Sequence, residues 1–167
     1  MHIRKIKPAD NRAIEQIIKS AILEFKLPMT GTAFEDLDTQ NMYDAYQQDR
    51  AVYYVLEDNG MVVGGGGIKA LQDNTDNVCE LQKMYFAKEA RGKGYGKLLF
   101  HKCIAAAKEF GFSQCYLESA SALEAAIHIY KKNGFVHLDG PLGGTGHYAC
   151  GVWMLKDLNA NSTDLHR

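Results

Sequence analysis

The sequence predicts an α/β (α+β) protein with a mixed, mostly antiparallel sheet of six to seven strands, flanked by about four helices. Two observations favour this class. Strand-like runs alternate with amphipathic helical stretches along the whole chain, and two of these runs are joined by a short hairpin turn. Hairpins give antiparallel pairs and strand–helix–strand units give parallel ones, so a chain that holds both predicts a mixed sheet.

The first elements follow from apolar periodicity. Residues 2–7 alternate like a strand, Pro8 interrupts it, and Asp10 is a candidate N-cap for a helix. Apolar side chains then recur at helical spacing, at Ile14, Ile17, Ile18, Ala21, Ile22 and Phe25. Pro28 is expected to end this helix.

The next segment contains the hairpin. Residues 30–38 are polar and acidic and predict a loop, and a short helix is expected over 39–48. Residues 51–57 are rich in β-formers and residues 61–71 return as their partner. The turn Asp58-Asn59-Gly60 between them is a strong hairpin signal, because Asn and Gly tolerate positive φ.

The middle of the chain predicts a strand–loop–helix–strand unit. Residues 78–86 form the strand, 90–96 a glycine-rich loop, 95–110 the helix and 114–118 the next strand. Gly111 is well placed to stop the helix.

The last elements are a helix and two strands. Ser121 and Glu124 match a capping box, so a helix is expected to open there and to close at Gly134. Residues 135–138 and 148–158 are the last strands, with a glycine-rich loop between them.

Size and charge exclude several classes of protein. The chain has 167 residues, and we expect one domain over 1–158 followed by a polar tail over 159–167. A net charge of −1 gives no reason to expect nucleic-acid binding, and no apolar run approaches the length of a membrane span. We therefore expect a cytoplasmic protein without a nucleic-acid or membrane partner.

The cysteines predict no metal site. Cys79, Cys103, Cys115 and Cys150 form no C-x-x-C pair and show no metal-ligand spacing. We expect reduced, mostly buried thiols.

The glycine-rich loop is the most informative segment for function. It leads from a strand into the first turn of a helix, where unpaired N–H groups and the helix dipole favour an anion. Its glycines are Gly92, Gly94 and Gly96, and its cations are Arg91, Lys93 and Lys97. A pyrophosphate suits this loop, although a glycine-rich turn with a solvated basic face would read the same way.

Two common phosphate motifs do not match. A Walker loop needs one more residue between Gly92 and Gly96, and Leu98 stands where a magnesium-binding Ser or Thr belongs. A dinucleotide fingerprint would need a glycine at Lys97. Binding of ATP or NAD is therefore a weaker alternative.

The loop does match R-x-x-G-x-G at Arg91, Gly94 and Gly96. With the later helix AAIHIYKKNGF (125–135) and the order of elements, nearly all of residues 1–158 resembles the GNAT superfamily of acyl-CoA-dependent N-acetyltransferases. The resemblance implies transfer of an acetyl group from acetyl-CoA to a primary amine of a small molecule or peptide, by direct attack and without a metal. A homodimer is also possible on this resemblance.

The resemblance assigns the binding of acetyl-CoA to two segments. The loop would hold the pyrophosphate, and the strand before it, splayed from its neighbour at a bulge, would pair with the pantetheine arm. A backbone N–H near Met84 would polarise the thioester carbonyl. The residues implied are Met84, Tyr85, Phe86, Arg91, Gly92, Lys93, Gly94, Tyr95, Gly96 and Lys97. Where many relatives have an Asn that holds the arm, this chain has Leu123.

The resemblance also implies an acid and a base. Tyr130 would protonate the leaving thiolate, unless it only packs under the sheet. Strand alternation would put Glu80, Gln82, Met84 and Phe86 on one face, and Glu80 would deprotonate the amine directly or through water, unless it is only a solvated carboxylate. His147 is an alternative base, although a surface histidine is the stronger expectation.

The acceptor is not specified by the sequence. An acidic cluster, Phe34, Glu35, Asp36 and Asp38, would suit a cationic amine or could form a solvated loop. A module that binds or senses acyl-CoA without turnover is the main alternative to an enzyme.

Overall fold

The computed structural model describes residues 1–159 and has one seven-stranded sheet in the order β1-β2-β3-β4-β5-β7-β6. The strands are β1 (His2–Lys5), β2 (Val52–Asp58), β3 (Met61–Ala70), β4 (Val78–Phe86), β5 (Gln114–Ser119), β6 (Val136–His137) and β7 (Val152–Asp157). The helices are α1 (Asn11–Glu24), α2 (Met42–Ala45), α3 (Tyr95–Glu109) and α4 (Glu124–Lys132). The predicted fold class is confirmed, while all of the expected tail except Asn159 lies outside the described residues.

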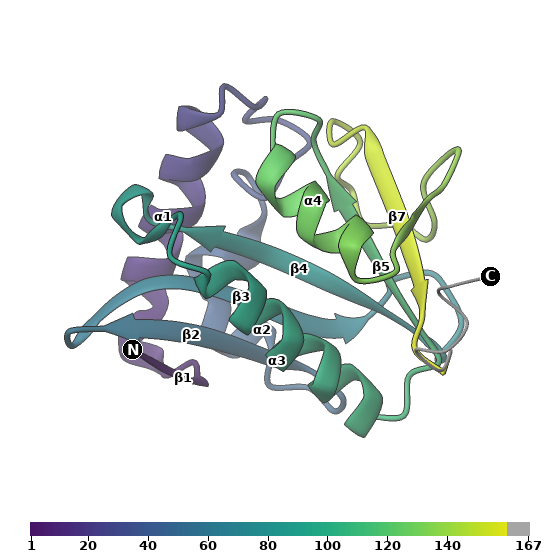
Figure 1. Ribbon diagram of the computed structural model, residues 1–167, viewed down its shortest axis with the longest axis horizontal. Helices are drawn as coiled ribbons and strands as arrows, with labels where there is room; N and C mark the ends of the chain where they lie inside the picture. Colours follow the sequence, from purple (N-terminus) through teal and green to yellow (C-terminus); the bar gives the residue numbers. More distant parts are fainter. Residues whose placement is uncertain (160–167) are drawn as a thin grey trace.

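The helices cover the sheet on both faces (Figure 1). On one face α1 and α2 pack on the sheet through a cluster that includes Ile14, Ile18, Met42 and Tyr53. On the other face α3 and α4 lie over a larger cluster. None of the described helices is long and apolar enough to span a bilayer.

The sheet opens between β4 and β5. Every strand pair is antiparallel except this one, which runs parallel and is hydrogen-bonded only over Val78–Glu80 and Gln114–Tyr116. Beyond Glu80 the two strands diverge, and Figure 1 shows their arrowheads pointing apart. The sheet therefore has an opening in its middle, between the antiparallel strands β1 to β4 on one side and β5, β7 and β6 on the other.

A β-bulge in β4 overturns the expected alternation of its side chains. Gly65 lies opposite Tyr85 and Gly67 opposite Gln82, so two residues of β4 face Gly66, and Lys83 takes the left-handed φ of +50°. One extra residue reverses the pleat. Met84 and Phe86 therefore pack on the α3 side, while Glu80 and Gln82 face the α1 side.

Two predicted helix starts are wrong in detail. Asp10 does precede α1, but its carboxylate accepts from Arg4 at 2.7 Å and from the Lys7 N–H at 2.7 Å, so it caps no helical N–H. The Ser121–Glu124 capping box does not form, because residues 120–123 make a separate turn closed by Leu123 N–H and Ala120 O, and α4 begins after it.

Two other boundaries also differ. The first helix ends before Pro28, because Lys26 takes a φ of +55° and the Leu27 N–H folds back to Ile22 O. The short helix expected over 39–48 is split into a 3₁₀ turn (Leu37–Gln40) and α2. The hairpin turn is as expected, with positive φ at Asn59 and Gly60.

Candidate active site

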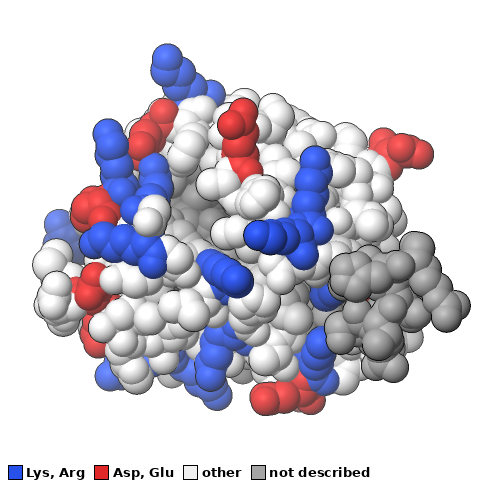
Figure 2. Space-filling model, viewed as in Figure 1, with Lys and Arg blue, Asp and Glu red and all other residues white. Residues whose placement is uncertain are grey.

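The glycine-rich loop presents unpaired backbone donors at the start of α3. Gly92 and Gly94 have φ of +75° and +80°, and a side chain added at either would meet open space. None of the N–H groups from Gly92 to Lys97 donates to another group within residues 1–159. Lys93 and Lys97 are exposed beside them, and Figure 2 shows Lys and Arg side chains around a hollow on this face. This arrangement fits a pyrophosphate.

The Arg91 and Tyr95 side chains tie the loop to the rest of the protein. The guanidinium of Arg91 donates to Phe86 O at 2.9 Å and pairs with Glu24 at 2.8 Å. Tyr95 donates its phenol to Asp58 at 2.9 Å. These contacts hold the loop in place, so Arg91 contributes by position rather than by a free charge.

The strand before the loop has an edge that no other described strand covers. From Leu81 to Phe86 the β5 side of β4 lacks a partner strand, because pairing with β5 ends at Glu80. Met84 and Phe86 pack on the α3 side, and Tyr85 lines a small pocket with Ser119 and Leu123. An extended ligand arm can therefore pair with this edge.

Tyr130 lies on the buried face of α4. It is 6% exposed, and its ring centroid is 5.8 Å from that of Phe100 and 5.9 Å from that of Phe135. Burial and the neighbouring Tyr85 phenol raise the pKa of Tyr130 above that of a free tyrosine. Its hydroxyl makes no hydrogen bond within the described residues, and its raised pKa keeps the phenol protonated at neutral pH.

A second pocket adjoins the first at the same opening and shares Tyr85, Glu118 and Cys150 with it. It is lined by β4, by the end of β5 and by the loops around Ala33 and His147. Its polar lining residues are Glu80, Gln82, Lys83, Tyr85, Glu118, His147 and Cys150. The structure thus brings Glu80 and His147 into one pocket, while Tyr130 lies in the core cluster on the other face of the sheet and is not among the residues that line it.

Glu80 is a buried carboxyl in this pocket. It is 3% exposed, it accepts a hydrogen bond of 2.6 Å from Gln82, and Gln82 accepts one of 2.7 Å from Tyr46. Burial, opposed by the Gln82 hydrogen bond and reinforced by Glu118, raises the pKa of Glu80 to about 7. A carboxyl with this pKa can take up and release a proton near neutral pH, as a general base must.

His147 is not the surface histidine that the sequence favours. Its side chain is 12% exposed and its Nε2 lies 2.6 Å from Asp36, whose carboxylate also pairs with Lys83 at 3.1 Å. Burial by itself lowers the pKa of His147, but the hydrogen bond and charge of Asp36 outweigh it and raise the pKa overall. Asp36 is therefore paired with two residues that line the pocket rather than solvated in a loop.

Three pocket residues were missed by sequence reasoning. Lys83, buried at the bulge, carried one signal, since it is a lone cation within an apolar strand. Glu118 accepts from Tyr116 at 2.7 Å and from Thr145 at 2.9 Å, and Cys150 lies close to it. The contacts of Glu118 with Thr145 and Cys150 join segments far apart in sequence, so no local pattern reveals them.

Comparison with known proteins identifies the family to which this fold and sequence are similar. Residues 19–135 match the model of the acetyltransferase (GNAT) family. The chain is 41% identical over 157 residues to the uncharacterized N-acetyltransferase YjgM of Escherichia coli, covering 93% of this chain and 94% of that relative. It is 33% identical over 103 residues to streptothricin acetyltransferase A of Bacillus subtilis, covering 62% of this chain and 57% of that protein.

Solved structures agree on the fold. A GNAT-family acetyltransferase from Staphylococcus aureus superimposes with a TM-score of 0.83 at 23% identity, covering 94% of this chain and 98% of that one. The putative acetyltransferase yncA of Salmonella typhimurium, solved with acetyl-CoA, gives 0.77 at 23% identity, covering 97% and 96%. With the family match and the YjgM relative, these findings establish that the chain belongs to the GNAT family and is an acetyl-CoA-dependent N-acetyltransferase.

Proposed function

We propose that acetyl-CoA and the acceptor amine meet in the opening between β4 and β5, each from its own face of the sheet. The observation that carries this proposal is the position of the two ionisable groups. Tyr130 lies in the core cluster on the α3 and α4 side of the sheet, against which Met84 and Phe86 of β4 also pack, and Glu80 lines the pocket on the α1 side. Direct transfer needs a base on the side of the amine and an acid on the side of the thiol.

The roles follow from this placement. Glu80 takes a proton from the ammonium of the acceptor, directly or through water, and so frees the lone pair that attacks the thioester carbon. A backbone N–H near Met84, at the bulge, stabilises the negative charge that develops on the carbonyl oxygen. As the C–S bond breaks, Tyr130 gives its proton to the leaving thiolate, and the second proton of the attacking nitrogen restores the phenol. The amide and the free thiol are the products.

The pocket favours a cationic primary amine of a small molecule or peptide. Asp36 is already matched by Lys83 and His147, whereas Glu80 and Glu118 have no cationic partner within the described residues. Their charge attracts an ammonium group. We place this chemistry in a single domain over 1–158 of a cytoplasmic protein, with free thiols at Cys79, Cys103 and Cys115 that suit a reducing compartment. We also propose a homodimer, which light scattering would test by measuring the molar mass in solution.

The test is a panel of amines with detection of released thiol. Diamines and basic peptides are expected to release CoA, and isosteric neutral alcohols are not. Glu118→Gln is expected to raise KM for cationic amines about tenfold with little change in kcat, because it removes an attractive charge without touching the reacting atoms. Tight binding of acetyl-CoA without turnover of any amine would instead support the sensing module.

A further inference from the structure

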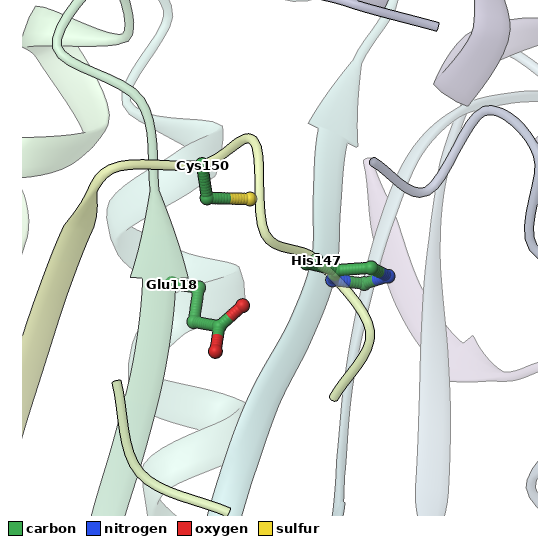
Figure 3. Close-up of side chains that lie close together, drawn as sticks. All are labelled: Glu118, His147 and Cys150. Carbon is green, nitrogen blue, oxygen red and sulfur yellow. The ribbon is translucent and has the colours of Figure 1, made fainter. Parts of the chain in front are cut away.

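We propose that Glu118, His147 and Cys150 form a zinc-binding site at the acceptor pocket. One ligand atom from each of the three side chains lies within 4.8 Å of the others. Figure 3 shows the Cys150 sulfur and the Glu118 carboxylate on the same side of His147, with a ring nitrogen turned toward them. Carboxylate oxygen, imidazole nitrogen and cysteine sulfur are the three donor types that zinc takes in proteins.

The histidine is oriented for this role. Its Nε2 is held by Asp36 at 2.6 Å, which leaves Nδ1 as the ring nitrogen available to a metal ion. A carboxylate behind a ligating histidine fixes the orientation of the ring and makes the other nitrogen a better ligand. Asp36 would therefore act as a positioning residue for zinc.

The other two ligands are held by their backbones and neighbours. Glu118 lies at the end of β5 and accepts hydrogen bonds from Tyr116 and Thr145. Cys150 is joined to His147 by a turn, Cys150 N–H to His147 O at 3.3 Å, and the turn is fixed to the N-terminal half by Ala149 N–H to Gly31 O at 3.2 Å. The site is thus largely formed before a metal ion arrives.

The ligand set selects zinc over hard cations. Bonds of about 2.3 Å to sulfur and about 2.0 Å to nitrogen require shifts of about 1 Å in these side chains. Magnesium and calcium prefer sites made only of oxygen, so a thiol and an imidazole disfavour them. The carboxylates of Glu80 and Glu118, which also face the pocket, add the negative potential that a divalent cation needs. Zinc binding would release the Cys150 thiol proton to solvent.

Zinc at this site would be an inhibitor and would take no part in acetyl transfer. The three ligands line the same pocket as Glu80, so a bound ion occupies the space of the acceptor ammonium. This consequence rests on the proposed function, whereas the site itself does not. Zinc is therefore expected to compete with the amine and not with acetyl-CoA.

Binding is tested without substrates, on reduced full-length chain freed of metal by dialysis against a chelator. Competition with a zinc-binding dye is expected to show one zinc per chain, and magnesium is expected not to displace it. Cobalt(II) is expected to give the visible spectrum of a tetrahedral site and a near-ultraviolet thiolate band. Cys150→Ser is expected to abolish that band and to weaken zinc at least tenfold, and Asp36→Asn to weaken it about tenfold.

The matched control is His137→Gln, which removes an exposed histidine of β6 and is expected to leave zinc affinity unchanged. Far-ultraviolet circular dichroism confirms that each variant is folded. The site is overturned if folded protein gives no thiolate band, or if Cys150→Ser binds zinc as tightly as the parent. If zinc binds through these residues but its inhibition is not competitive with the amine, the proposal that zinc and the acceptor ammonium occupy the same space is wrong.

Discussion

Glu80 combines features that rarely occur together in a carboxyl group. It is almost fully buried, it has one neutral hydrogen-bond donor, and its nearest charged neighbours are of both signs, Glu118 against Lys83 and His147. The pKa of about 7 follows mainly from burial. A buried carboxyl that titrates near neutral pH is a candidate for proton transfer.

The Glu80 base predicts a pH dependence of activity. The ionised form is the base, so kcat/KM is expected to rise with pH through a step near pH 7. Glu80→Gln is expected to lower kcat/KM by about 100-fold and to abolish the step. The pH profile of kcat/KM is measured at subsaturating amine. His147→Gln is the control, and this variant should keep the step near pH 7. A step that persists in Glu80→Gln and vanishes in His147→Gln would transfer the role to His147.

Tyr130 can be tested with little risk to the fold. Phenylalanine keeps the packing against Phe100 and Phe135 and removes only a hydroxyl that has no partner in the described structure. Tyr130→Phe is expected to lower kcat about 10- to 100-fold without changing the affinity for acetyl-CoA. Calorimetry and steady-state rates give the two quantities. Tyr54→Phe, in the same apolar cluster, is the control, and equal rate losses in both variants would contradict an acid role.

At the scale of elements, the loop before α3 is the clearest test of acetyl-CoA binding. Gly94→Asp puts a carboxylate where the pyrophosphate is expected, and acetyl-CoA affinity should fall at least tenfold, or about 1.4 kcal/mol. Gly111→Asp is a matched control at the other end of α3, because its φ of +83° resembles the +80° of Gly94 and both positions face open space.

The two glycine variants separate strain from charge. Both should lose a similar amount of stability, since both force a side chain into the left-handed region. Only Gly94→Asp should lose acetyl-CoA in calorimetric titrations. Equal affinities in the two variants would remove the loop from the binding site, and ATP or NAD binding as tightly as acetyl-CoA would revive the nucleotide alternative.

Elements that are defined by a local sequence pattern could be predicted from the sequence. Features that depend on contacts with other parts of the chain could not. The Asn59-Gly60 turn and the helix after Gly94 follow from backbone preferences that neighbours do not change. Asp10 was expected to cap a helix, yet Arg4 of β1, six residues earlier, holds its carboxylate. The bulge at Lys83 inserts one residue into a regular alternation, and alternation alone gives no sign of it.

At the scale of the whole molecule, the acceptor pocket is a product of tertiary structure. Asp36, Lys83 and His147 are ion-paired or hydrogen-bonded although they come from three separate segments. Glu80 and Tyr130 could be proposed from the sequence because they lie in segments that resemble a known family. Lys83 carried one signal, as a lone cation in its strand, but Glu118 and Cys150 could not be proposed, since only the opening between β4 and β5 and the loop that closes it bring them together.

The pocket also has a cost for the stability of the whole chain. The folded-state pKa of Glu80 lies above its ordinary 4.5, so folding favours the protonated form. That contribution is fully present below about pH 4.5 and is lost as pH rises to about 7. At 1.36 kcal/mol per pKa unit, the folded chain loses up to about 3 kcal/mol over this window.

Glu80→Gln removes this dependence because an amide stays neutral. The free energy of unfolding of the variant, relative to the parent, is expected to rise between about pH 5 and about pH 8 by up to about 3 kcal/mol. Urea unfolding at the two pH values measures it, and groups common to both proteins cancel in the difference. A difference that is flat with pH would mean that Glu80 titrates at its ordinary value and is no base near neutrality. A difference that rises over the same pH range in which kcat/KM of the parent rises would show that the same buried carboxyl gives the chain its base and costs it stability.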